Sequence, residues 1–191
     1  YAHIEDAYGD GDFSTFSAPL TATYDSRNSA IDATSGIYAW LLAEPQYAIN
    51  TSSPFFPGDA ELRLYHALDE DARFVLAARG RVGSILAADI EEIPAHRRFY
   101  AGGGGSVRGY EYLGIGPRLE GYGPTGGLSR VEGSLEARIK VTDTIGIVPF
   151  VDAGYVAENT SFTGNEEFRW AAGLGLRYYT AVGPIRLDVA I

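Results

Sequence analysis

Polar and apolar side chains alternate with a period of two along most of this chain. In the clearest run, one parity is polar throughout and the other is apolar or small: Arg130, Glu132, Ser134, Glu136, Arg138 and Lys140 against Val131, Gly133, Leu135, Ala137, Ile139 and Val141. Because successive side chains of a strand point to opposite faces, this pattern predicts strands with one polar and one apolar face. Apolar residues seldom recur at three- and four-residue spacing, so the chain is predicted to be all-β.

About eight strands are predicted from this alternation. Their approximate ranges are 13–24, 36–47, 59–68, 73–85, 130–141, 145–156, 168–179 and 185–191. Short turns at 142–144 and 181–183 alternate loosely with longer connections at 51–58, 87–127 and 157–167. The first of these longer connections carries Pro54 and Pro57 and is predicted to be a loop. The connection at 87–127 is far longer than loops usually are in compact domains, and such loops are commonly functional or disordered.

Two architectures produce strands of this kind: a soluble β-sandwich, whose apolar faces form a core, and an outer-membrane β-barrel, whose apolar face contacts lipid. The predicted strand length favours the barrel, since a tilted strand needs about 9–11 residues to cross a membrane, whereas soluble strands average about 5–6. Aromatic residues near predicted strand ends also fit an interfacial girdle: Tyr24, Tyr47, Tyr155, Phe168 and Tyr178. The sandwich remains an alternative, and chain solubility without detergent would favour it.

Composition narrows the function classes. The 191 residues include no Cys, which excludes a disulfide framework, a thiolate metal site and a thiol nucleophile. The formal net charge of -10 argues against broad nucleic-acid binding. No apolar run approaches the roughly 20 residues of a membrane-spanning helix, and no signal peptide is recognisable. Because the sequence starts and stops within patterned segments, we expect it to be a fragment of a longer protein.

One segment of the long connection stands out chemically. Four consecutive glycines, 102–105, precede Arg108, which lies between Val107 and Gly109. Glycine has too much backbone freedom to hold a helix or a strand, but it suits a loop tip that folds back tightly. The segment is therefore predicted to insert the guanidinium into a confined place; a disordered glycine linker is the alternative.

The residues around this segment resemble the bacterial surface antigen family, the barrel domain of outer-membrane protein assembly factors. The signature loop is carried by Gly102, Gly103, Gly104, Gly105, Val107, Arg108, Gly109 and Tyr110, and the partner strand by Phe150, Asp152 and Gly154, with Glu136 between them. The resemblance covers nearly the whole of residues 1–191, and within the superfamily it is strongest to TamA, the barrel subunit of the translocation and assembly module.

The resemblance implies a fold, a location and a function. The fold would be an antiparallel transmembrane β-barrel of roughly 16 strands, of which this chain holds about the C-terminal half without the last strand. The location would be the bacterial outer membrane, and the protein would help to insert or secrete outer-membrane proteins such as autotransporters. Its partners would be those clients, the lipid bilayer and a periplasmic or inner-membrane accessory subunit. A secretion pore for one partner protein and a passive porin-like channel are the alternatives.

For the site, the resemblance implies that the 87–127 loop enters the barrel lumen and that Arg108 docks on carboxylates of the barrel wall. The pattern supports this, since Glu136 and Asp152 lie on the polar parity of neighbouring strands. A guanidinium can engage one carboxylate bidentately and still reach a second. The hypothesis is that Arg108 bridges Asp152 and Glu136. In the alternative, Asp152 is solvated and Glu136 pairs with Arg138 or Arg130.

Other chemistry is not indicated. The three histidines, His3, His66 and His96, are scattered without ligand spacing, so no metal site is predicted. Ser106 does not lie in a nucleophile elbow, because Arg108 occupies the second glycine position of that motif. The glycine run also lacks the Lys-Ser/Thr pair of a phosphate-binding loop. No enzymatic activity, catalytic residue or cofactor is therefore expected.

Overall fold

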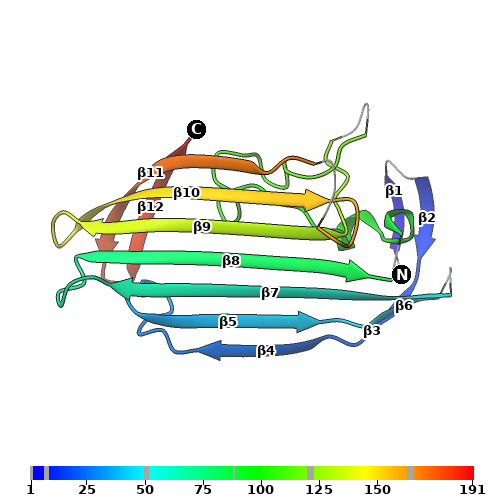
Figure 1. The fold of residues 1–191 in the computed structure, drawn as a ribbon, viewed down its shortest axis with the longest axis horizontal. Coiled ribbons are helices and arrows are strands. Elements are labelled where there is room, and N and C mark those ends of the chain that lie inside the picture. Colours follow the sequence, from blue (N-terminus) through cyan, green and yellow to red (C-terminus); the bar gives the residue numbers. More distant parts are fainter. Residues whose placement is uncertain (1, 7–8, 50–51, 88, 120–122, 163–165) are drawn as a thin grey trace.

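The alternating segments pair in sequence order into one antiparallel sheet (Figure 1). The computed structural model describes residues 2–6, 9–49, 52–87, 89–119, 123–162 and 166–191. The strands that follow one another across the sheet are β4 (Leu20–Asp25), β5 (Gly36–Ala43), β7 (Ser53–Ala67), β8 (Phe74–Leu86), β9 (Ser129–Lys140), β10 (Ile145–Ala157), β11 (Arg169–Thr180) and β12 (Gly183–Ala190). Two short strands lie off this path: β3 (Thr15–Ser17) pairs with β6 (Gln46–Ala48), and β6 pairs with β7. The all-β, antiparallel prediction is confirmed.

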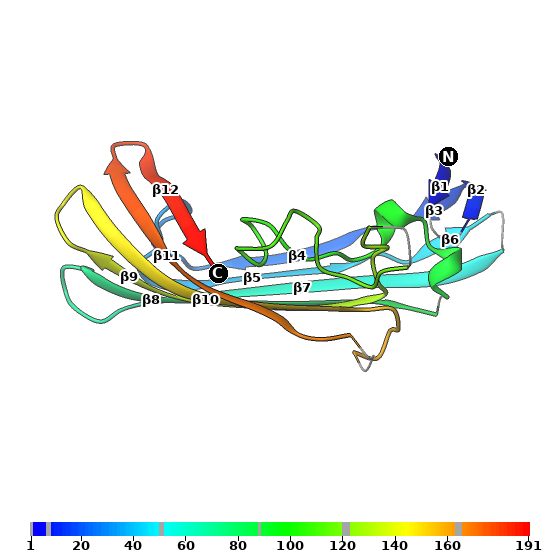
Figure 2. The same cartoon turned by 90° about the horizontal axis from the view of Figure 1, so that it is seen from above.

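The two faces of the sheet differ as the alternation predicts. Figure 2 shows that the sheet curves, with β9 to β12 rising at one end, and the sheet is thus an open part of a barrel. Apolar side chains on the convex face are exposed, among them Leu64, Leu76, Leu135, Val151, Leu174 and Leu187. Buried charged residues lie on the opposite parity. This arrangement is the inverse of a sandwich, in which apolar faces pack together. Among the described residues, no helix is long and apolar enough to span a membrane.

The connection between β8 and β9 lies on the concave face (Figure 2). It contains two short 3-10 helices, η1 (Ile90–Glu92) and η2 (Ala95–Arg97), and is otherwise irregular. Its base is held by the reciprocal backbone hydrogen bonds between Phe99 and Gly127, at 2.8 and 2.9 Å. Two apolar clusters seat it on the sheet: one around Phe55, Ile85, Ile90 and Ile93, the other formed by Ala101, Val107, Ile115 and Val156. The connection is therefore an ordered part of the fold across its described residues.

The prediction of a loop at 51–58 is wrong for the residues that the structure describes, because β7 begins at Ser53. Pro54 pairs with Tyr47 of β6, and Pro57 faces Ile85 of β8. Pro57 lies where β7 changes partner from β6 to β5, and its carbonyl still accepts a 2.9 Å hydrogen bond from the Glu44 N–H. Pro54 lies before Phe56, the first residue of β7 that pairs with β8, so β7 has a partner on one side only at that position. Proline is tolerated where the ladder is interrupted or one-sided in this way.

Three further details differ from prediction. The hairpin of β1 (Ala2–Asp6) and β2 (Gly9–Phe13) was not predicted, because these Asp- and Gly-rich segments lack a regular apolar parity. The predicted strands 13–24 and 36–47 are each interrupted, near Pro19 and Pro45 respectively. Tyr155 is not an exposed girdle residue: it is buried, and its ring stacks on Phe168 with centroids 4.9 Å apart.

We expect Leu135→Lys to destabilise the protein in a bilayer, because Leu135 is 65% exposed on the convex face in the middle of β9. A Lys on the lipid face near the membrane midplane costs about 2–4 kcal/mol. Urea unfolding from liposomes measures this cost, with Leu135→Ile as the size-matched control. Equal stability of the Lys and Ile variants would show that this face does not contact lipid.

Candidate functional site

The tip of the long connection is a tight turn that only glycine allows at two positions. Gly102 and Gly103 have φ values of +106° and +97°, a region that side chains with a Cβ rarely adopt. The Gly103 N–H donates to the Val107 carbonyl at 3.1 Å, and the Ser106 N–H donates to the Gly103 carbonyl at 3.0 Å. The Ser106 hydroxyl accepts from the Gly102 N–H at 2.9 Å. The turn thus reverses the chain immediately before Arg108.

Arg108 is buried on the concave face and contacts both carboxylates that the sequence indicates. Its Nε and Nη2 donate to the two oxygens of Asp152 at 2.7 and 2.8 Å, which is a bidentate pair. Its backbone N–H also donates to Asp152 Oδ2, at 3.0 Å. Its Nη1 donates to Glu136 Oε1 at 2.8 Å. Strands β9 and β10, which are neighbours in the sheet, therefore supply two carboxylates to one guanidinium.

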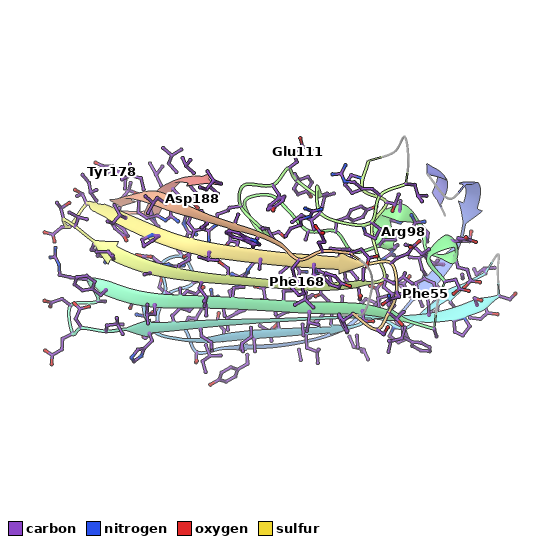
Figure 3. All side chains as sticks on the ribbon, turned by 45° about the horizontal axis from the view of Figure 1, so that its top comes forward. Phe55, Arg98, Glu111, Phe168, Tyr178 and Asp188 are labelled. Carbon is purple, nitrogen blue, oxygen red and sulfur yellow. The ribbon has the colours of Figure 1, made fainter. Side chains whose placement is uncertain are left out.

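Arg108 has three further contacts that the sequence did not predict, although Phe150 belongs to the predicted motif. Nη1 also donates to Asp188 Oδ2 of β12 at 3.1 Å (Asp188 is labelled in Figure 3), and Nη2 donates to the Ser134 hydroxyl at 3.2 Å. The guanidinium carbon lies 3.4 Å from the centre of the Phe150 ring, a cation–π contact. The parity of Asp188 could have indicated it, since it alternates with Leu187 and Val189 and pairs with Gly175, which leaves space above it.

Two of the carboxylates that contact Arg108, Glu136 and Asp188, each accept a hydrogen bond from a second arginine as well. Glu136 Oε2 accepts from Arg138 Nε at 2.9 Å, so the predicted bridge to Arg108 and the alternative pairing with Arg138 both exist. Asp188 accepts from Arg177 through its other oxygen. Burial alone would lower the pKa of Arg108, but the hydrogen bond with Asp152 and the charge of Glu136 raise that pKa above its usual value. Arg108 is therefore a permanent cation.

The residues next to Arg108 fit closely against β10 to β12. Val107 is fully buried, and a Cβ at Gly154 would lie 2.6 Å from its Cγ2. Gly109 has a φ of +90°, and a Cβ there would meet Ala190 Cβ at 3.1 Å and Ala171 Cβ at 3.4 Å. The Tyr110 hydroxyl donates to the Trp170 carbonyl at 3.1 Å. Of the signature glycines, Gly104 and Gly105 make no such close approach.

A second set of ion pairs, also missed from the sequence, holds other parts of the connection. Arg79 of β8 donates to the carbonyls of Gly105 and Ser106, the latter at 2.6 Å, and pairs with Glu132 at 3.1 Å. Arg130 donates to the Tyr100 carbonyl at 3.3 Å and to Asp59 at 2.8 Å. The tip and the base of the connection are thus held by cations of the sheet.

A cavity of about 360 Å³ lies between the loop tip and the sheet and is lined by Arg108, Glu136, Asp152 and Asp188, among others. The described residues contain no group of three or more His, Asp or Glu side chains that could hold a metal ion. The hydrogen bonds of Arg108 make the arrangement a multidentate electrostatic contact between a loop and a sheet, with the ring of Phe150, the remaining residue of the predicted motif, against the guanidinium.

We expect Asp152→Asn to release the loop, because it leaves the Arg108 guanidinium buried beside an uncharged amide. Breaking a buried ion pair from one side costs about 3–5 kcal/mol, and Asp152 is only 1% exposed. Limited proteolysis should then cut within residues 99–126 much faster than in the parent. Asp143→Asn, in the exposed turn between β9 and β10, is the matched control. Unchanged protection in Asp152→Asn would contradict the structural role of the pair.

We also expect Gly154→Ala to displace Val107, since the added methyl would overlap its Cγ2. Overpacking of this kind costs about 1–3 kcal/mol. The double variant Gly154→Ala/Val107→Ala should recover much of the loss, because the second change removes the clashing methyl group. Thermal unfolding of the two single variants and the double variant tests this, and purely additive losses would show that the two residues are not in contact.

Comparison with known proteins identifies the fold and the family of the chain. Residues 1–191 match the model of the Omp85 superfamily domain. The outer membrane protein assembly factor BamA of Nitratidesulfovibrio vulgaris is 29% identical over 147 residues, an alignment that covers 72% of this chain and 18% of the relative. The crystal structure of BamA from Haemophilus ducreyi lacking POTRA domains 1-3 gives a TM-score of 0.78 at 22% identity, covering 98% of this chain and 41% of that one. This chain thus spans less than a fifth of the curated relative and less than half of the solved structure. Because the family match covers the whole sequence, the chain belongs to the Omp85 superfamily of outer-membrane β-barrel proteins.

Proposed function

We propose that this chain is part of an outer-membrane protein assembly factor and that the Arg108 cluster locks the long connection inside its barrel. The observation that carries the proposal is the position of Arg108, which reaches carboxylates of three strands, β9, β10 and β12. Family membership supports it, since a curated relative is named an outer membrane protein assembly factor. The lock is the contact of Arg108 with Asp152, Glu136 and Asp188.

The lock argues against the passive channel. A porin-like channel conducts through an open lumen, whereas here the connection lies across the concave face and is tied to it at its base and its tip. An uncompensated buried guanidinium is costly, so the connection has one strongly preferred position. A barrel whose interior loop is fixed in this way is better suited to assembling client proteins than to letting solutes diffuse through its lumen.

Within this function we propose the TamA type, with autotransporters as clients and a periplasmic or inner-membrane accessory subunit as partner. This finer assignment rests on the motif resemblance of the 99–110 segment and the Phe150–Gly154 strand. A secretion pore dedicated to one partner protein is the competing assignment within the superfamily. The two assignments differ in their clients: autotransporters for the TamA type, and one dedicated partner protein for the secretion pore.

Insertion of clients into liposomes that contain the whole protein tests the proposal. We expect accelerated insertion of an autotransporter barrel, and Arg108→Lys should reduce the rate about tenfold, since a single ammonium cannot replace the bidentate fork and about 1.4 kcal/mol of barrier suffices. Asp143→Asn should insert clients like the parent. If Arg108→Lys freed the loop to protease but left insertion unchanged, the lock would not serve assembly.

Single-channel conductance of the parent and of a variant that lacks residues 99–126 distinguishes an assembly factor from a passive channel. Deletion of residues 99–126 should raise conductance sharply if the connection closes the lumen. A parent protein that already conducts like the deletion variant would favour the channel.

A further inference from the structure

The connection between β4 and β5, residues 26–35, also lies on the concave side of the sheet. It lies at the same end of the sheet as the short turns 68–73, 141–144 and 181–182, opposite the end from which the long connection starts. Figure 2 shows it in blue beside the red β12. We call residues 26–35 the short-end segment.

The short-end segment links the two edges of the sheet path. It begins after β4, at one edge, and reaches β12, at the other. Arg186 of β12 donates from Nη2 to the Ile31 carbonyl at 3.4 Å. A Cβ at Gly183, where β12 begins, would lie 2.8 Å from Ile31 Cγ2. Between the edges, Arg138 of β9 donates from Nη1 to the carbonyl of the buried Ala33 at 3.3 Å.

Its own hydrogen bonds order the segment. The Asn28 Oδ1 accepts from the N–H groups of Thr34 and Ser35, at 3.0 and 3.2 Å, and Asn28 Nδ2 donates to the Thr34 hydroxyl at 2.7 Å. Arg27 forms a bidentate pair with Asp25, at 2.9 and 2.7 Å. These contacts fix the loop shape, so that Ile31 and Ala33 are presented across the sheet as one unit.

Arg138 joins this segment to the lock. Its Nη1 holds Ala33, while its Nε donates to Glu136 Oε2 at 2.9 Å. The other oxygen of the same carboxylate accepts from Arg108 at 2.8 Å. Its guanidinium carbon also lies 5.2 Å from the centre of the Tyr65 ring, which restricts its rotation. One carboxylate therefore stands between two arginines, one from the sheet and one from the long connection.

We propose that the short-end segment is a second closure of the barrel interior and that Arg138 is the positioning residue that couples it to the lock. If the hydrogen bond between Arg138 and Glu136 broke, the Glu136 carboxylate would lose one of its two cations and would be held less firmly in position to accept from Arg108. If Arg108 left, Glu136 and Arg138 would lose the partner that fixes them, and Ala33 would be held less firmly. The coupling is reciprocal, as any equilibrium coupling between two sites must be. This inference rests on the lock described above.

A spin label on the short-end segment of the whole protein tests the coupling. These 191 residues contain no Cys, so Ala30→Cys gives one attachment point among them, at an exposed position; any Cys elsewhere in the whole protein is replaced by Ser first. We expect Arg138→Gln to raise the mobile fraction of the label about twofold or more and to speed cleavage within residues 99–126 by a similar factor. Arg73→Gln is the matched control, because Arg73 binds the carbonyls of Lys140 and Val141 at the same end without contacting the segment through any described bond.

Two more variants separate coupling from simple loss of structure. Arg138→Lys keeps the charge beside Glu136 but lacks the fork that reaches both acceptors, so it should free the label while preserving most of the protease protection. Arg108→Gln should mobilise the label when Arg138 is present and have no further effect in an Arg138→Gln background.

A label that stays immobile in Arg138→Gln, or that ignores Arg108→Gln, would overturn the inference. Because these readouts are label mobility and cleavage, they are independent of client insertion. Intact coupling with no insertion activity would therefore reject the proposed function alone.

Discussion

A buried guanidinium must have its charge compensated, and this requirement organises the concave side of the sheet. Arg108 comes from an irregular connection and finds its partners on β9, β10 and β12. Those partners are far apart in sequence, and only the register of the three strands brings them to one point. The same requirement explains why the neighbouring residues are small: Gly154, Gly175 and Gly109 leave the space in which a planar fork and its backbone approach the sheet.

The compensation is shared among residues, so the charges form a network instead of isolated pairs. Glu136 and Asp188 each divide their oxygens between Arg108 and a second arginine of the sheet. Asp59 also has two arginine partners, and its Oδ2 accepts from both Arg81 and Arg130, at 2.6 and 2.8 Å. The chain has a net charge of -10, yet in the cluster around Arg108 the arginines Arg108, Arg138 and Arg177 pair with an equal number of carboxylates, Glu136, Asp152 and Asp188. Positions within such a network respond to one another, because a carboxylate oxygen that loses one donor must find another or be solvated.

Alternation along each strand predicted which face of the sheet a side chain lies on. The contacts that depend on how neighbouring strands are aligned could not be predicted from it. Parity fixes the face of a side chain, so the alternation sufficed to place Glu136 and Asp152 on the interior side of neighbouring strands. Parity does not say how far along its strand a residue sits relative to the neighbouring strand. The contact of Asp188 with Arg108 and the pairings of Arg79 and Asp59 therefore could not be predicted, although parity could place Asp188 on the interior face. Proline was misleading at Pro54 and Pro57 because its effect depends on whether the ladder needs that donor, which only the pairing partner decides.

The chemistry of the lock also indicates what it is for. Buried ion pairs are a poor means of gaining stability, since well-packed apolar side chains of equal volume often do as well or better. They are a good means of selecting one arrangement among many, because every misplaced arrangement leaves a charge unpaired. A connection of this length, with glycine at its tip, has many ways to lie against an apolar surface and few ways to satisfy Arg108. Unique placement is what the proposed assembly function requires of a loop inside the barrel, and an apolar plug would not supply it.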